Sequence, residues 1–126
     1  MKRILVMEDD TQFRQMLRLI LERAGYEVVD APDGKEGLKL YRQAPTDLVI
    51  TDIIMPEKEG VETIIELRRD FPNVKIIAIS GGGRIDSKAC LNMAGNLGVV
   101  RTFSKPFDRG ELLEAIQELL GEVVVP

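Results

Sequence analysis

With 126 residues, of which 44% are hydrophobic and 30% charged, the chain has the size and composition of one folded domain, and we expect a single domain over residues 1–126. Its formal net charge of −4 disfavours direct binding to nucleic acid, and no apolar run approaches the roughly 20 residues that a membrane helix needs, so we expect a cytoplasmic protein without a membrane partner. The absence of histidine excludes Ser-His-Asp catalysis and histidine metal sites, which leaves carboxylates, lysine and hydroxyl groups for chemistry.

Short β-branched stretches alternate with amphipathic ones along the chain. Strands are predicted at 4–7, 26–30, 48–51, 74–79 and 99–103, and helices at 34–44, 60–71 and 86–97. A first helix lies between the first two strands and ends at Gly25, and a last helix opens with Asp108 and Glu111 as a cap pair and ends at Gly121. The first helix is expected to bury Phe13, Met16, Leu17, Ile20 and Ala24, and the last one Leu112, Leu113, Ile116, Leu119 and Leu120. The single cysteine, Cys90, is expected to be a small buried hydrophobic residue.

This alternation predicts an α/β fold, a doubly wound five-stranded parallel sheet with helices on both faces. The second strand carries Glu27 and Asp30, and the fifth carries Arg101 and Thr102, whereas the other three are mostly apolar. Strands two and five are therefore expected at the edges, which gives the order 2-1-3-4-5. In such a sheet ligands bind beyond the carboxyl ends of strands one and three, where the strand order reverses.

Three carboxylates are predicted to meet at that point. Glu8 and Asp9 follow strand one, and Asp52 follows strand three. Each close pair repels by roughly 1 kcal/mol in water and ~4 kcal/mol near a protein surface, so the cluster needs a cation. Oxygen ligands without His or Cys favour Mg²⁺, which commonly shares its shell with a phosphate.

Two further residues, Ser80 after strand four and Lys105 after strand five, are expected at the same edge, where a hydroxyl and an ammonium could bind phosphoryl oxygens. Plainer interpretations stay open for each residue. Glu8-Asp9-Asp10 could cap the first helix, with Asp9 and Gln12 as a loose capping box, and Asp52 could be a turn residue. Lys105 could be a solvated surface charge, and Ser80 to Gly83 a flexible loop.

Four motifs carry a family resemblance: ILVMEDD at 4–10, LVITDIIMP at 48–56, IIAIS at 76–80 and SKPF at 104–107. From Lys2 to about Leu120 the chain resembles the receiver domain of bacterial two-component response regulators, in particular chemotaxis receivers, with their flavodoxin-like fold. The resemblance implies that Asp52 accepts a phosphoryl group from a phosphohistidine on a sensor kinase or phosphotransfer domain. It also implies Mg²⁺, or Mn²⁺ in its place, bound by Asp9 and Asp52 directly, by Glu8 through water and by the Ile54 carbonyl, with Ser80 and Lys105 contacting the phosphoryl group.

The chain departs from the family at Thr102, where an aromatic switch residue is usual. Coupling could instead run through the glycine-rich loop from Gly81 to Arg84, which phosphorylation would order. The main alternative is a degenerate receiver that binds proteins without phosphorylation. A flavin or nucleotide binder lacks support because the loop after strand one is acidic, and an aspartyl phosphatase lacks a second acid in Asp52-Ile53-Ile54. Whether the chain acts alone or belongs to a longer regulator stays open.

Overall fold

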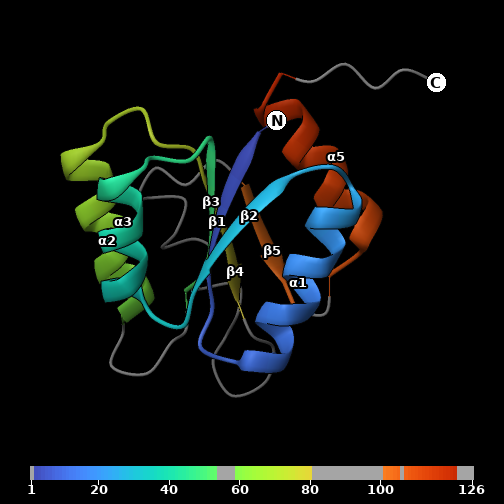
Figure 1. The fold of residues 1–126 in the computed structure, drawn as a ribbon, viewed down its shortest axis with the longest axis horizontal. Helices are drawn as coiled ribbons and strands as arrows, with labels where there is room; N and C mark the ends of the chain where they lie inside the picture. Colours follow the sequence, from blue (N-terminus) through green and yellow to red (C-terminus); the bar gives the residue numbers. More distant parts are fainter. Residues whose placement is uncertain (1, 54–58, 81–100, 106, 122–126) are drawn as a thin grey trace.

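The computed structural model describes residues 2–53, 59–80, 101–105 and 107–121, which form one sheet flanked by helices (Figure 1). The strands are β1 (Arg3–Met7), β2 (Glu27–Ala31), β3 (Leu48–Asp52), β4 (Ile76–Ser80) and β5 (Arg101–Ser104). The helices are α1 (Thr11–Arg23), α2 (Gly34–Gln43), α3 (Glu59–Asp70) and α5 (Arg109–Leu119). The predicted helix at 86–97, Cys90 and the loop from Gly81 to Arg84 lie outside the described residues. None of the described helices is long and apolar enough to cross a lipid bilayer.

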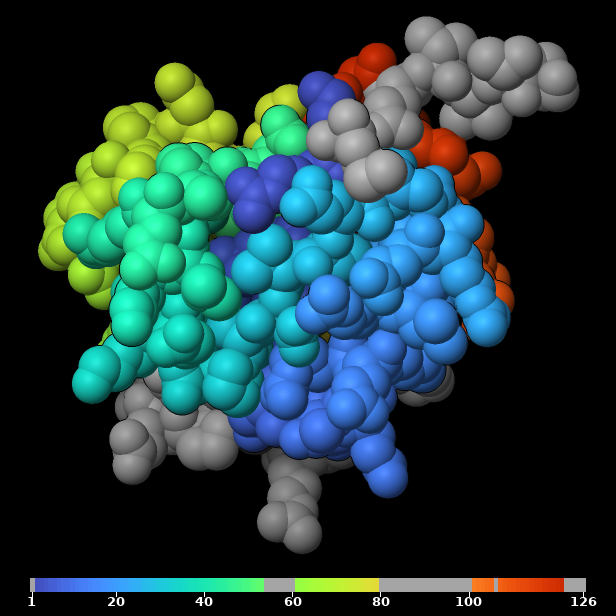
Figure 2. Space-filling model, viewed as in Figure 1, coloured from blue at the N-terminus to red at the C-terminus, as the bar shows by residue number. Residues whose placement is uncertain are grey.

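The sheet has the predicted strand order, β2-β1-β3-β4-β5, and every neighbouring pair is parallel. The polar strands β2 and β5 are the edges, as expected. In Figure 1, α1 and α5 lie on one side of the sheet and α2 and α3 on the other, which confirms the doubly wound architecture. The edge strand β2 runs across the face shown in Figure 2, between α1 and α2.

Two hydrophobic clusters fill the space between the sheet and its helices. Successive side chains of a strand point to opposite faces, so Ile4 and Val6 of β1 join the cluster under α1 and α5, whereas Leu5 and Met7 join the one under α2 and α3. Burial on both faces explains why β1, β3 and β4 read as apolar runs rather than as alternating patterns.

The register of the sheet aligns the ends of β1 and β3. Met7, the last residue of β1, pairs with Thr51, so the residue after Met7 and the residue after Thr51 reach the same level. Those residues are Glu8 and Asp52. The carboxyl edge of the sheet therefore carries the predicted acidic residues.

Aspartates begin three of the helices. The Asp108 carboxylate accepts a hydrogen bond from the Glu111 amide at 3.0 Å, which confirms the predicted cap of α5. Of the alternative in which Glu8-Asp9-Asp10 cap the first helix, capping by the acidic segment is confirmed, but the capping box of Asp9 and Gln12 is wrong. The N-cap of α1 is Asp10, whose carboxylate accepts from the Phe13 amide at 3.1 Å, so the Asp9 side chain stays outside the helix.

The predicted apolar stripe of α1 is wrong at two positions. Leu17 and Leu21 are buried, whereas Met16 is 44% exposed and Ala24 is exposed. Residues four apart share one side of a helix, and Met16 is rotated by about 100° from Leu17, so the side that faces the sheet is centred on Leu17 and Leu21. Strand β4 starts at Ile76 rather than 74, because the Val74 amide donates to the Phe71 carbonyl in a turn.

Candidate metal and phosphoryl site

A three-residue segment, Glu8 to Asp10, joins β1 to α1 at the carboxyl edge of the sheet. The Glu8 amide extends the pairing with β2 by donating to the Ala31 carbonyl at 3.1 Å. The Asp10 amide donates to the Glu8 carboxylate at 3.3 Å, while Asp10 itself caps α1. These bonds leave Glu8 buried, at 2% exposure, and Asp9 exposed.

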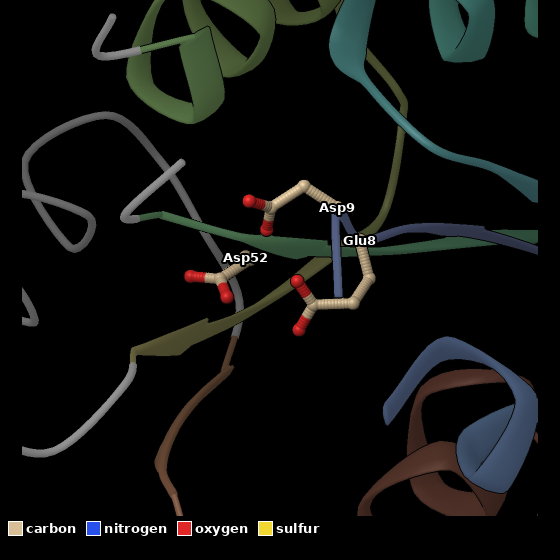
Figure 3. Close-up of side chains that lie close together, drawn as sticks. All are labelled: Glu8, Asp9 and Asp52. Atoms are coloured by element: carbon tan, nitrogen blue, oxygen red, sulfur yellow. The ribbon is translucent and has the colours of Figure 1, made fainter. Parts of the chain in front are cut away.

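Asp52 ends β3 beside this segment and is 5% exposed. One carboxylate oxygen from each of Glu8, Asp9 and Asp52 lies within 4.8 Å of the other two. Figure 3 shows the three side chains gathered around one space, with Glu8 and Asp9 coming from the end of β1 and Asp52 from β3. The structure thus brings together the acidic residues that the sequence placed at adjacent strand ends.

Lys105, directly after β5, reaches two of these carboxylates. Its Nζ donates to Asp52 Oδ2 at 2.9 Å and to Glu8 Oε1 at 2.5 Å. The interpretation of Lys105 as a solvated surface charge is therefore wrong, since its side chain is 21% exposed and paired. Sequence reasoning placed Lys105 near Asp52 but did not predict its bond to Glu8.

An aromatic ring packs against the Lys105 ammonium. Lys105 Nζ lies 4.0 Å from the centre of the Phe13 ring, which is a cation–π contact, and Phe13 packs edge-to-face against Phe107 at 5.8 Å. The sequence indicated Phe13 only as part of the apolar side of α1. Its contact with Lys105 could not be predicted, because an apolar residue on a helix carries no signal of which charged group it will touch.

The electrostatics of the site follow from burial and from the lysine. Burial, opposed by the hydrogen bond from Lys105 and reinforced by the neighbouring Asp9 and Asp52 carboxylates, raises the pKa of Glu8 from its ordinary value of 4.5 to about 7. Burial alone would lower the pKa of Lys105, but its hydrogen bonds to Glu8 and Asp52 outweigh burial and raise that pKa. The lysine therefore stays charged at neutral pH.

The residues present fit a hard divalent cation. All donors of the acidic cluster are carboxylate oxygens, the ligand type that Mg²⁺ and Ca²⁺ prefer. When fully ionised, the three carboxylates and one ammonium leave two negative charges, which one divalent cation would neutralise. The exposed Asp9 opens the cluster to solvent, as an ion that keeps several waters requires.

The remaining predicted site residues are only partly described. Ser80 ends β4 at the same edge of the sheet, where it pairs with Ser104 of β5, one residue before Lys105. The Ser80 side chain, Ile54 and Pro106 lie outside the described part of the structure. Phe103 is buried in the cluster under α1 and α5, while Thr102, the next residue back, is half-buried.

The chain is similar to known proteins in sequence and in structure. Residues 4–117 match the response regulator receiver domain family. The chain is 35% identical over 119 residues to the chemotaxis protein CheY of Thermotoga maritima, covering 94% of this chain and 97% of that protein. It is 32% identical over 119 residues to the transcriptional regulatory protein GlrR of Escherichia coli, covering 94% of this chain but 26% of that protein. A receiver domain protein from Clostridium thermocellum has a closely similar solved structure, with a TM-score of 0.88, 28% identity and coverage of 96% and 95%.

Sheet order and acidic edge together define a receiver-type α/β domain. The matches extend over nearly the whole chain, and the response regulator receiver protein CpdR of Brucella abortus is 34% identical over 124 residues, covering 95% of this chain and 98% of that protein. The chain belongs to the response regulator receiver family of two-component systems.

Proposed function

We propose that this chain is a single receiver domain, over residues 1–126, that accepts a phosphoryl group on Asp52 from a phosphohistidine donor in a Mg²⁺-dependent reaction. One observation carries the proposal. Lys105 Nζ bridges Asp52 and Glu8, and Asp9 offers a third carboxylate oxygen within 4.8 Å of theirs. The Lys105 ammonium could neutralise charge on an incoming phosphoryl group, and the carboxylates could neutralise a cation beside it.

In the proposed transfer, an oxygen of the Asp52 carboxylate attacks phosphorus in line with the bond to the histidine nitrogen. The phosphorus–nitrogen bond breaks, its electron pair stays on the imidazole, and Asp52 becomes an acyl phosphate. Asp9 and Asp52 would hold Mg²⁺ directly, Glu8 through water, and Ile54 through its carbonyl. The bound ion would supply positive charge next to the transferring oxygens.

Lys105 would follow the negative charge as it moves. Before transfer its ammonium pairs with the Asp52 carboxylate, and after transfer it can donate to a phosphoryl oxygen, with the Ser80 hydroxyl as a second donor. Hydrolysis of the acyl phosphate would return Asp52 to a carboxylate. The domain would therefore act as a phosphoacceptor switch that catalyses its own phosphorylation and dephosphorylation, rather than as a conventional enzyme.

The proposed partners are proteins. Since this stretch of sequence has no histidine, the phosphohistidine must lie outside it, and we propose a sensor histidine kinase or a histidine phosphotransfer domain as the donor, with small phosphodonors as substitutes. Phosphorylation would change the surface offered to a downstream protein. The net charge of −4 disfavours direct contact with nucleic acid, so we propose none. We also propose a cytoplasmic location without membrane contact.

Intact-mass measurement after incubation with Mg²⁺ and acetyl phosphate tests the proposal. Wild type is expected to gain one phosphoryl group, and Asp52→Asn none. Asp47→Asn is the matched control, because Asp47 is an exposed aspartate just before the opposite end of β3 and an Asn oxygen can still accept from the Arg3 amide. Chelation of Mg²⁺ should abolish the gain in wild type.

Equal modification of wild type and Asp52→Asn would remove Asp52 as the acceptor. No modification of any chain, by acetyl phosphate or by a phosphorylated histidine phosphotransfer domain, would instead favour the degenerate receiver that binds proteins without phosphorylation.

A further inference from the structure

We propose that Arg14 is a positioning residue that fixes the peptide between Glu8 and Asp9, and through it two of the three carboxylates of the acidic cluster. The inference rests on the proposed function, because it assigns Arg14 to the geometry of the proposed ion site. Arg14 lies one turn into α1, and its side chain is 14% exposed.

The guanidinium of Arg14 joins three elements. Nη1 donates to the carbonyl of Glu8 at 2.7 Å, and Nε donates to Asp30 Oδ2 of β2 at 3.0 Å. The Asp30 carboxylate therefore holds the Nε end of the guanidinium, while the Glu8 carbonyl accepts from its Nη1 end. Because the guanidinium is rigid, the position of the Glu8 carbonyl is tied to β2 through a single side chain.

The Glu8–Asp9 peptide needs such a tie because β1 has ended. The Glu8 amide still pairs with Ala31, and Asp10 is fixed as the cap of α1, but the peptide between them belongs to neither element. A peptide is planar, so turning the Glu8 carbonyl away from Arg14 would also turn the Asp9 amide and shift the Asp9 Cα. The charge-assisted bond from Arg14 opposes that rotation.

Arg14 acts on backbone geometry, whereas Lys105 compensates the charge of the carboxylates. The molecule offers a matched control for this distinction. Arg18, one turn further along α1, donates to the same Asp30 carboxylate at 2.5 Å. Its other ion pair among the described residues is with Glu22 at 3.5 Å, on the same helix. Removing Arg18 disturbs the Asp30 network and the local charge, yet leaves the bond to the Glu8 carbonyl in place.

Calorimetric titration of the full chain with MgCl₂ tests the proposal. Compared with wild type, R14A is expected to bind Mg²⁺ about 10-fold or more weakly, the loss found when an outer partner of a metal site is removed. R18A is expected to stay within about 2-fold of wild type. R14K should recover part of the loss, since an ammonium can donate to the Glu8 carbonyl but lacks the fork that also holds Asp30.

Two readouts separate positioning from general stability. Urea unfolding without divalent ions measures the stability that each variant loses: R14A and R18A both lose an ion pair with Asp30, and R14A should lose more because it also lacks the bond to the Glu8 carbonyl. Amide spectra of the ion-free protein should show the Asp9 resonance shifted, and its hydrogen exchange faster, in R14A but not in R18A. If R14A does not fold, R14K and R18K are compared in the same measurements.

Equal Mg²⁺ affinities in wild type and the Arg14 variant would overturn this proposal alone. The same would follow if the Arg18 variant lost as much affinity as the Arg14 variant, since the effect would then belong to the Asp30 charge network. A wild type that does not bind Mg²⁺ would overturn both this proposal and the proposed function.

Discussion

Gly37, on the buried side of α2, leaves no room for a side chain against β1. A Cβ at this position would overlap Met7 Sδ and lie 2.5 Å from Met7 Cγ, well inside van der Waals contact. Met7 is 1% exposed and belongs to the cluster under α2 and α3, so its side chain cannot swing into solvent. Gly37→Ala must therefore move the side chain of Met7, the last residue of β1, within the core or push α2 outward.

Two opposing terms set the expected stability of Gly37→Ala. Alanine gains about 1 kcal/mol over glycine in a helix, whereas overpacking a core costs about 1–3 kcal/mol. The variant should be destabilised by up to about 2 kcal/mol. In a Met7→Ala background the clash is absent, and the same substitution should instead stabilise by about 1 kcal/mol. The sign of the effect is expected to reverse between the two backgrounds.

Urea unfolding of the four chains (wild type, the two single variants and the double variant) measures this coupling. With a slope of about 1–3 kcal/mol per molar urea, 1 kcal/mol moves the midpoint by about 0.3–1 M, which is resolvable. The expected interaction energy is about 1–3 kcal/mol in favour of the double variant. A value below about 0.5 kcal/mol would mean that the contact between Gly37 and Met7 is not tight, and that glycine is there for another reason.

Two further predictions concern the segment between β1 and α1. The pKa of Glu8 in the folded protein, about 7, lies above its ordinary value of 4.5, so between these pH values the folded protein keeps a proton that the unfolded chain has lost. The stability that protonated Glu8 contributes is therefore fully present below pH 4.5 and is lost as the pH rises to about 7. Without divalent ions, the difference in unfolding free energy between wild type and Glu8→Gln should therefore fall across that range, and a pH-independent difference would contradict the burial argument. Asp10→Ala should cost about 1 kcal/mol by removing the cap of α1, while Asp10→Asn should cost little because asparagine caps equally well; equal losses in urea unfolding would show that charge rather than capping matters.

The architecture could be predicted because it depends on patterns along the chain. Apolar runs in three strands and polar residues such as Glu27 and Arg101 in the other two were enough to place the edges, since burial on two faces leaves no room for charge. Glu8, Asp9 and Asp52 could be grouped because strand ends in a parallel sheet share one edge. The exact cap of α1 was missed, and its buried side was wrong at Met16 and Ala24, because each depends on a shift of one residue that the apolar pattern does not resolve.

Contacts of the site beyond its carboxylates could not be predicted in the same way. The bond from Arg14 to the Glu8 carbonyl joins a side chain to a backbone atom, and no residue type marks a carbonyl as needing a donor. Likewise, the position of the Lys105 ammonium over the Phe13 ring depends on how α1 lies beside the end of β5. Such details are decided by packing in three dimensions, after the order of the strands is set.

Topology also explains why a lysine serves at position 105. β5 is separated from β3 by β4, and neighbouring strands lie about 4.8 Å apart, so a group following β5 must span about 10 Å to reach Asp52 and more to reach Glu8. A side chain of four methylene groups with a compact charge at its end provides the reach that these two bonds need. A shorter cation would take the compensating positive charge away from two buried carboxylates, at a cost of several kcal/mol. In the strand order that this chain adopts, the carboxylates that follow β1 and end β3 thus lie within reach of a long cationic side chain after β5.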